Sequence, residues 1–232
     1  MKNIIIMGGS GHAKTIIDIV ERENRHRIVG VLDPALHVGE RLLGHPVLGG
    51  DGELPELVKR YGIEGAILAI GENHQRAVLA ERLAIRHPDL PLVSAVHPGA
   101  AIGKGTTLGE GTVVMAGAVI GPDCRVGRLC VVNTLASLDH DSFLEDFASL
   151  APHAATGGNC RIGRGAFLGM GAVVIHGIRV GEHALLGAGA VAVRDVAALT
   201  LSLGVPARVV RFRRADEPGW HAGPGHSEAG SG

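Results

Sequence analysis

The second half of the sequence repeats with a period of six residues over roughly ninety residues. Steps of six from Val96 to Leu186 give sixteen positions, and fifteen of them carry Val, Ile or Leu. A period of six fits neither an α-helix at 3.6 residues per turn nor an isolated strand at 2, but it fits a short strand followed by a turn. The pattern therefore predicts a β-solenoid in which each strand adds one aliphatic side chain to a shared core.

Two other positions of the six-residue unit are equally regular. The position two residues before the aliphatic is small at fifteen of sixteen places, and it includes Cys124, Cys130 and Cys160. We expect these cysteines to be compact core residues with free thiols. The position after the aliphatic one is Gly nine times, and we expect it to allow turn conformations that other residues resist. A narrow solenoid also explains why the chain has 36 Gly but only one Trp, one Tyr and four Phe.

Residues 1–95 follow a different pattern, an alternation of β and α segments. We expect strands at 3–7, 28–32, 66–70 and 92–94, and helices at 12–23, 54–61 and 73–87. This order predicts a small Rossmann-like parallel sheet with any ligand site at the carboxyl ends of its strands. The loop Gly8-Gly9-Ser10-Gly11 is neither a GxGxxG fingerprint nor a P-loop. It is either a simple tight turn or a helix N-terminus that holds a phosphate.

Charge and composition narrow the function classes. The chain has 22 Lys and Arg against 23 Asp and Glu, a balance that does not favour nucleic acid or a membrane surface as a partner. No run of about 20 apolar residues and no secretory signal is present, so we expect a cytoplasmic protein. Without CxxC spacing we expect no metal site. The predicted units are an α/β domain (1–95), the solenoid (96–203), a C-terminal cap segment (204–214) and a flexible tail (215–232).

The motifs together resemble a known family. Gly8 to Lys14 reads GGSGHAK, Leu32-Asp33-Pro34 follows the second strand, Ala69-Ile70-Gly71 follows a later strand, and [LIV]-G-x-x-x-x units come next. Over residues 1 to about 211 this is similar to the hexapeptide-repeat acyltransferases of the sialic-acid O-acetyltransferase-like family, closest to bacterial nucleotide-amino-sugar N-acetyltransferases of the bacillosamine type. The resemblance implies a Rossmann-like α/β domain followed by a left-handed parallel β-helix of about five coils. It also implies a homotrimer.

The resemblance further implies the substrates and the residues that bind them. The acyl donor would be acetyl-CoA, and the acceptor would be a nucleotide-linked amino sugar, with a UDP-4-amino-4,6-dideoxy sugar for surface glycan or glycoprotein synthesis favoured. The residues implied to bind the nucleotide sugar are Ser10, Gly11, His12, Asp33, Pro34, Gly71 and Asn133. The residues implied to bind acetyl-CoA are Ser149, Gly158, Met170 and Ala188. Ser149 stands where close relatives have a second histidine, so either its hydroxyl or a backbone N–H of the Gly157-Gly158 turn would hold the thioester oxygen.

The repeat loses its glycines between Asn133 and Ala155, and such a local departure is where function is expected. His140 lies there between Asp139 and Asp141. The chemistry needs a base, because an attacking amine must lose a proton and an imidazole with a pKa near 6.5 can accept it. By resemblance, His140 is the general base and Asp141 raises its basicity, with Asp139 as the rival for that role. Four arginines near the C-terminus are candidates for binding CoA phosphates: Arg208, Arg211, Arg213 and Arg214.

Other functions remain open at this point. Within the transferases, the alternatives are a GDP-perosamine-type N-acetyltransferase and a sialic-acid O-acetyltransferase. A zinc hydratase of γ-carbonic-anhydrase type would use His140 and His176, which are two coils apart, but it needs a third histidine where Gly181 stands. A non-catalytic solenoid scaffold is the last alternative, and the resemblance of the first domain to a nucleotide-sugar-binding domain argues against it.

Overall fold

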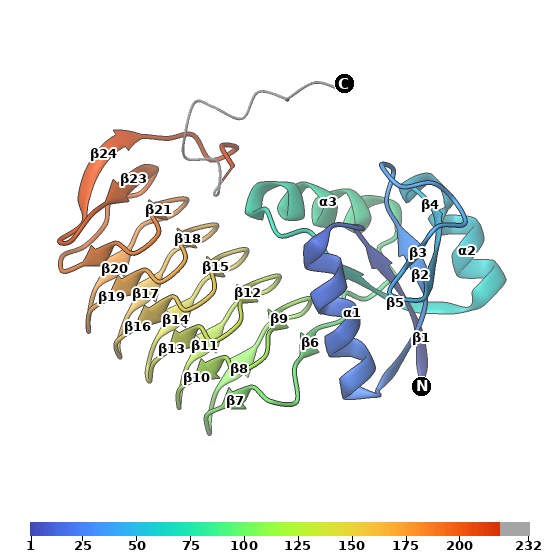
Figure 1. Ribbon diagram of the computed structural model, residues 1–232, viewed down its shortest axis with the longest axis horizontal. Coiled ribbons are helices and arrows are strands. Elements are labelled where there is room, and N and C mark those ends of the chain that lie inside the picture. The colour runs from blue at the N-terminus through green and yellow to red at the C-terminus, as the bar shows by residue number, and fades with distance from the viewer. Residues whose placement is uncertain (219–232) are drawn as a thin grey trace.

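A computed structural model of the chain describes residues 1–218. It has an α/β unit at the N-terminal end and a long solenoid that follows it directly (Figure 1). The α/β unit holds a five-stranded sheet in the order β3-β4-β2-β1-β5. Its elements are β1 (Lys2–Met7), α1 (Gly11–Glu23), β2 (His26–Leu32), β3 (Arg41–Leu42), β4 (His45–Gly49), η1 (Asp51–Glu53), α2 (Leu54–Tyr61), β5 (Ile63–Leu68) and α3 (Asn73–Arg86).

Strands β1, β2, β4 and β5 pair in parallel, as the β/α alternation predicts. The β3–β4 hairpin was not expected, because its turn uses Leu43-Gly44, both at positive φ, in place of the usual Asn-Gly. No strand forms at 92–94, where Leu92 makes only an isolated bridge to Ala66. Central β1 has β2 on one side and β5 on the other, so the crevice expected of such a sheet lies beside the carboxyl end of β1.

The solenoid is built from two-residue strands, and those up to position 174 each pair in parallel with the strand 18 residues further on, as Val119 pairs with Ser137. These strands are β6 (Ala95–Val96), β7 (Ala101–Ile102), β8 (Thr107–Leu108), β9 (Val113–Val114), β10 (Val119–Ile120), β11 (Arg125–Val126), β12 (Val131–Val132), β13 (Ser137–Leu138), β14 (Phe143–Leu144), β15 (Ser149–Leu150), β16 (Ala155–Thr156), β17 (Arg161–Ile162), β18 (Phe167–Leu168), β19 (Val173–Val174), β20 (Arg179–Val180), β21 (Leu185–Leu186) and β22 (Val191–Ala192). They form three parallel sheets. The predicted solenoid is confirmed.

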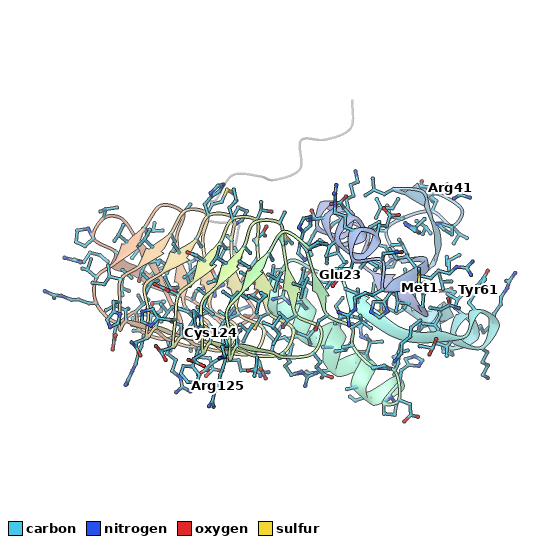
Figure 2. The ribbon with its side chains drawn as sticks, turned by 90° about the horizontal axis from the view of Figure 1, so that it is seen from below. Met1, Glu23, Arg41, Tyr61, Cys124 and Arg125 are labelled. Carbon is cyan, nitrogen blue, oxygen red and sulfur yellow. The ribbon has the colours of Figure 1, made fainter. Side chains whose placement is uncertain are left out.

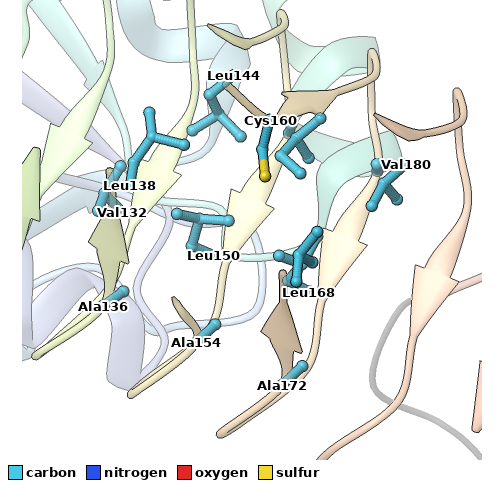
Figure 3. Packing of buried hydrophobic residues seen from close by; sticks show 14 of the residues in the cluster. Val132, Ala136, Leu138, Leu144, Leu150, Ala154, Cys160, Leu168, Ala172 and Val180 are labelled. Atoms are coloured by element: carbon cyan, nitrogen blue, oxygen red, sulfur yellow. The ribbon is translucent and has the colours of Figure 1, made fainter. Parts of the chain in front are cut away.

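The core has the composition that the repeat predicts. Aliphatic residues such as Leu138 and Leu150 and small residues such as Ala136 and Ala154 fill the interior (Figure 3). The three cysteines are buried and unbridged, and burial raises the pKa of the Cys130 thiol to about 12. They are core residues with inert thiols, as expected.

The expected role of the repeat glycines was wrong. None of the glycines that follow the aliphatic residue has positive φ; instead, a Cβ there would strike the next coil, as at Gly103, where it would lie 2.4 Å from the backbone carbon of Gly121. The positive-φ position is two residues further on. There the backbone is left-handed whether the residue is Gly or not, since Asp141 has φ 56° and His153 has φ 60°. The glycines therefore serve close stacking of the coils rather than turn conformation.

The three faces of the solenoid differ in what covers them. The docked face, formed by the sheet that begins with β6 and β9, packs against the α/β unit, with Val113 and Val131 in the same core cluster as Ile16. The charged face, formed by β8 to β20, presents Arg125, Phe143 and Arg161 to solvent; Arg125 points away from the coil while Cys124 lies inside (Figure 2).

The apolar face, formed by β7 to β22, has no charged residue in its outward row and has no cover within residues 1–218. That row is Ala101, Val119, Ser137, Ala155, Val173 and Val191. The solenoid ends at β23 (Thr200–Leu203), which pairs antiparallel with β24 (Arg208–Phe212). This hairpin overlaps the predicted cap segment, and the predicted tail lies outside the described residues from position 219 onward.

Candidate active site

A cleft of about 520 Å³ lies between the α/β unit and the docked face of the solenoid. The α/β unit contributes the segments that follow β1, β2 and β5, and the solenoid contributes the ends of β12, β15 and β18. The cleft is thus at the crevice that the sheet topology predicts. Its lining includes Gly8, Gly9, Ser10, His12, Asp33, Ile70, Gly71, Glu72, Gln75, Asn133, Ser149, Ala151, Phe167 and Met170.

The loop after β1 presents the N-terminus of α1 to this cleft. Ser10 is the N-cap but makes no side-chain capping bond, and the first turn has no acidic residue. The free N–H groups there attract an anion. The Asp33 carboxylate accepts hydrogen bonds from the Gly9 and Ala35 N–H groups, at 2.5 and 2.8 Å, so it fixes the loop. Gly8 is required: its φ is 113°, and a Cβ would lie 2.7 Å from the Ala69 carbonyl oxygen.

His12 lines the cleft as a neutral imidazole. Burial, and next the charge of Arg76, lower its pKa to about 4. Its Nε2 atom is buried and has no hydrogen-bond partner among the described residues. A neutral imidazole with an unused ring nitrogen is suited to a hydrogen bond with a bound ligand.

Arg76 on α3 joins the two units behind the cleft. Its side chain is only 1% exposed and makes no ion pair with any described carboxylate. The guanidinium donates to the carbonyls of Ile70 and Gly71 in the α/β unit and to those of Leu129 and Phe147 on the solenoid, at 2.8 to 3.1 Å. Burial lowers its pKa to about 10, so the group stays charged at neutral pH. Arg76 therefore fixes both walls of the cleft.

Ser149 belongs to the same buried network. Its hydroxyl donates to Asn73 Oδ1 at 2.6 Å and accepts from Arg76 Nη2 at 3.1 Å. Its only hydrogen is therefore committed, and the side chain is 3% exposed. This favours a backbone N–H, rather than the Ser149 hydroxyl, as the donor to a thioester oxygen. Ser149 remains a lining residue whose hydroxyl holds the wall in place.

His140 lies in the turn between β13 and β14, at the corner where the apolar face meets the charged face. Its Nδ1 is 2.7 Å from Asp141 Oδ2, and this hydrogen bond is the main reason that the pKa of His140 is raised. Asp139 Oδ1 instead accepts from the His140 backbone N–H at 2.8 Å. Of the two carboxylates, Asp141 is thus the ring partner. The Nε2 atom is left for a ligand.

Gly158 provides the space that the His140 ring occupies. It lies one coil further on, and a Cβ there would approach both Cε1 and Nε2 of His140 to 2.5 Å. The ring of His176, on the coil after that, lies 6.3 Å from the His140 ring. Across residues 1–218, no group of three or more His, Cys, Asp or Glu side chains has a geometry that could hold a metal ion.

The structure brings most of the expected binding residues together, but not the expected base. Ser10, His12, Asp33, Gly71 and Asn133 line the cleft, as do Ser149 and Met170, while Pro34 lines an adjoining cleft. Residues expected at the site that line neither cleft are Gly11, His140, Asp141, Gly158 and Ala188. Asn133 and His140 occupy different corners of the coil. A single chain thus has the cleft and the histidine on separate surfaces.

The sequence did not predict the role of Glu72, and the structure gives the C-terminal arginines partners that were not expected. Glu72 caps α3 by accepting from the His74 and Gln75 N–H groups, and it lines the cleft although it is 5% exposed. The signal was a carboxylate directly before a predicted helix. Most of the C-terminal arginines already donate hydrogen bonds to nearby acidic residues. Arg211 and Arg213 donate to Glu217, and Arg214 donates to Asp216. These contacts compete with any role in binding phosphates.

Comparison with known proteins identifies both units. Residues 3–83 match the PglD N-terminal domain, and residues 159–192 match the bacterial transferase hexapeptide repeats. A GDP-perosamine N-acetyltransferase from Caulobacter crescentus, solved with CoA and GDP-perosamine, is 37% identical; the match covers 90% of this chain and 97% of that one, with a TM-score of 0.83. The acetyltransferase domain of PglB from Neisseria gonorrhoeae, solved with acetyl coenzyme A, is 30% identical over 90% and 99% of the two chains, with a TM-score of 0.83.

A UDP-N-acetylbacillosamine N-acetyltransferase from Bacillus subtilis is 35% identical over 105 residues, about half the length of each protein (45% and 47%). These matches place the chain among the hexapeptide-repeat acyltransferases, and the solenoid is a left-handed parallel β-helix. Within that class, the chain belongs to the family of nucleotide-amino-sugar N-acetyltransferases whose N-terminal domain is of the PglD type. The predicted family and fold class are confirmed. No helix in the described part of the chain is long and apolar enough to cross a membrane.

Proposed function

We propose that this protein is a cytoplasmic enzyme that transfers an acetyl group from acetyl-CoA to the amine of a nucleotide-linked amino sugar. The acetylated sugar would serve the synthesis of surface glycans or glycoproteins. The observation that carries the proposal is the composition of the cleft. One wall is the strand-end crevice of a Rossmann-like sheet with an open helix N-terminus, and the other is a set of hexapeptide coils. Such a cleft can hold an anionic nucleotide at one end and present a sugar to the coils at the other.

The charges of the cleft support one direction for the substrate. The diphosphate would lie at the N-terminus of α1, where Gly11 and His12 provide backbone N–H groups and the first turn of the helix carries no acidic residue. The sugar would then extend toward Asn133 and the other solenoid residues of the cleft. Neutral His12 can donate or accept one hydrogen bond there without adding charge.

His140 is proposed as the general base. The unprotonated amine of the sugar attacks the carbonyl carbon of the thioester, a C–N bond forms, and the C–S bond breaks as the carbonyl is restored. Nε2 of His140 accepts the proton that the nitrogen loses, and the departing CoA sulfur takes up a proton as the thiol. Asp141 holds Nδ1 and stabilises the imidazolium that forms. No covalent bond to the enzyme is needed.

We further propose that three copies associate through the apolar face. Val119 and Val173 are 47% and 37% exposed on this face, and Leu135 and Met170 beside it are 53% and 62% exposed. An uncharged, exposed apolar surface of this kind is stabilised when a second copy covers it. His140 borders the same face, so association would bring His140 of one copy toward the cleft of the next. This arrangement explains why the cleft of a single chain lacks the base.

The test is acetyl-CoA turnover with nucleotide-linked 4-amino sugars as acceptors. His140→Ala should leave acetyl-CoA binding nearly intact and lower kcat at least about a hundredfold. His37→Ala, an exposed histidine outside both clefts, is the matched control and should keep full activity. Full activity of His140→Ala would remove His140 from the mechanism. Absence of turnover by the native protein with every amino-sugar nucleotide would refute the proposed function.

A further inference from the structure

A second cleft of about 360 Å³ opens from the first at the carboxyl ends of β2 and β5. The two clefts share Gly8, Asp33, Ile70 and Gln75, so a single elongated ligand can occupy both. If the diphosphate lies at the N-terminus of α1 and the sugar points to the coils, the nucleobase falls in the second cleft. This step rests on the proposed function, which leaves the identity of the base open.

The second cleft has an apolar wall and one charged pair. Leu32, Ile70, Val78 and Leu79 give it surfaces against which a planar ring can pack, and Pro34 adds another. At its rim, Arg82 Nη1 on α3 donates to Asp51 Oδ2 at 3.0 Å. Their side chains are 48% and 27% exposed. No hydrogen bond within residues 1–218 engages the second oxygen of Asp51 or the second terminal nitrogen of Arg82.

The pair thus presents an anionic acceptor beside a cationic donor. The Watson–Crick edge of guanine offers the complement: O6 accepts, and N1–H and N2–H donate side by side. Asp51 can accept from N1–H and N2–H together, as a carboxylate does in bidentate pairing, while Arg82 donates to O6. Uracil offers only one donor, N3–H, and its O2 would face the carboxylate as a second acceptor. Adenine presents an acceptor, N1, in the place where guanine has a donor.

We propose that the second cleft selects a guanine nucleotide through Asp51 and Arg82, and that the physiological acceptor is a GDP-linked amino sugar. The sequence favoured UDP by family resemblance, but the charged pair fits guanine better. The loss of one charge-assisted hydrogen bond, with an acceptor facing a carboxylate in its place, disfavours uracil by about tenfold or more.

The test measures dissociation constants of GDP, UDP and ADP by isothermal titration calorimetry with the full chain. The native protein should bind GDP at least about tenfold more tightly than UDP or ADP. Asp51→Asn should weaken GDP binding by about tenfold and leave UDP binding within about threefold, so that the preference collapses. Glu56→Gln removes a carboxylate from neighbouring α2, outside both clefts, and should bind every nucleotide as the native protein does.

The outcomes separate this proposal from the proposed function. If UDP binds as tightly as GDP, or if Asp51→Asn keeps the native GDP-to-UDP ratio, guanine selection is overturned while the transferase function stands. If no nucleoside diphosphate binds to the native protein, both are overturned. A preference for GDP that depends on Asp51 but not on Glu56 supports the proposal.

Discussion

Replacing Gly158 by Ala should disable His140 without unfolding the solenoid. The added Cβ would lie 2.5 Å from Cε1 and Nε2 of His140, whereas ordinary carbon contacts begin at about 3.5 Å. The ring must therefore move by about 1 Å or rotate away from Asp141. Because the obstacle is the exposed end of a side chain, the backbone of the coil need not shift. A displacement of about 1 Å at a reacting group costs about a hundredfold in rate.

The matched control is Gly163→Ala, in which the new Cβ meets backbone, 2.7 Å from the Glu182 nitrogen. It should lower the melting temperature markedly, while Gly158→Ala should keep a near-native melting temperature and lose about a hundredfold in kcat. Thermal unfolding and thiol release from acetyl-CoA measure the two effects. Full activity in Gly158→Ala, or a fall in its melting temperature as large as that of Gly163→Ala, would refute the reasoning.

Further predictions concern the charges and the free face. Asp141→Asn should return the pKa of His140 toward its ordinary value, so the acidic limb of the pH profile of kcat/KM should move to lower pH; an unchanged limb would argue against the pairing. His12 has a lowered pKa of about 4, so the native state takes up fewer protons than the unfolded chain. The free energy of unfolding should therefore fall by at most about 3 kcal/mol as the pH is lowered from about 6.5 to about 4. His12→Gln should flatten this pH dependence in urea titrations. Arg76→Met leaves several carbonyls unpaired and should cost about 3 kcal/mol or more in denaturant unfolding; a native-like midpoint would contradict the role of Arg76 in joining the units. Val119→Glu should dissociate the proposed trimer in sedimentation measurements, and an unchanged mass would exclude the apolar face as the interface.

The sequence was most informative where one residue type has one physical role. The aliphatic and small positions of the repeat predicted the solenoid core, because an inward position excludes charged and aromatic side chains from Val96 to Leu186. The glycine prediction failed for a related reason. Sequence shows that a side chain is excluded but not what excludes it, and at Gly103 the obstacle is the neighbouring coil rather than φ.

The site was predicted in part. The loop from Gly8 to His12 and the residues Asp33 and Gly71 follow strand ends, so topology alone brings them to one crevice. Arg76 could not be recognised, because a buried arginine on an amphipathic helix looks like a solvated one until its carbonyl partners on the solenoid are known. The separation of His140 from the cleft also required the coil geometry, since corner positions depend on the register of the repeat.

The most direct test of acetyl transfer to a nucleotide-linked amino sugar is mass spectrometry of the acceptor after incubation with the protein and acetyl-CoA. The predicted result is the gain of one acetyl group on the sugar nitrogen of a nucleotide-linked 4-amino sugar, with one CoA thiol released per acetyl transferred, and loss of both in His140→Ala. Thiol release without acetylation of the sugar, or acetylation on a hydroxyl oxygen rather than the amine, would contradict the proposed activity.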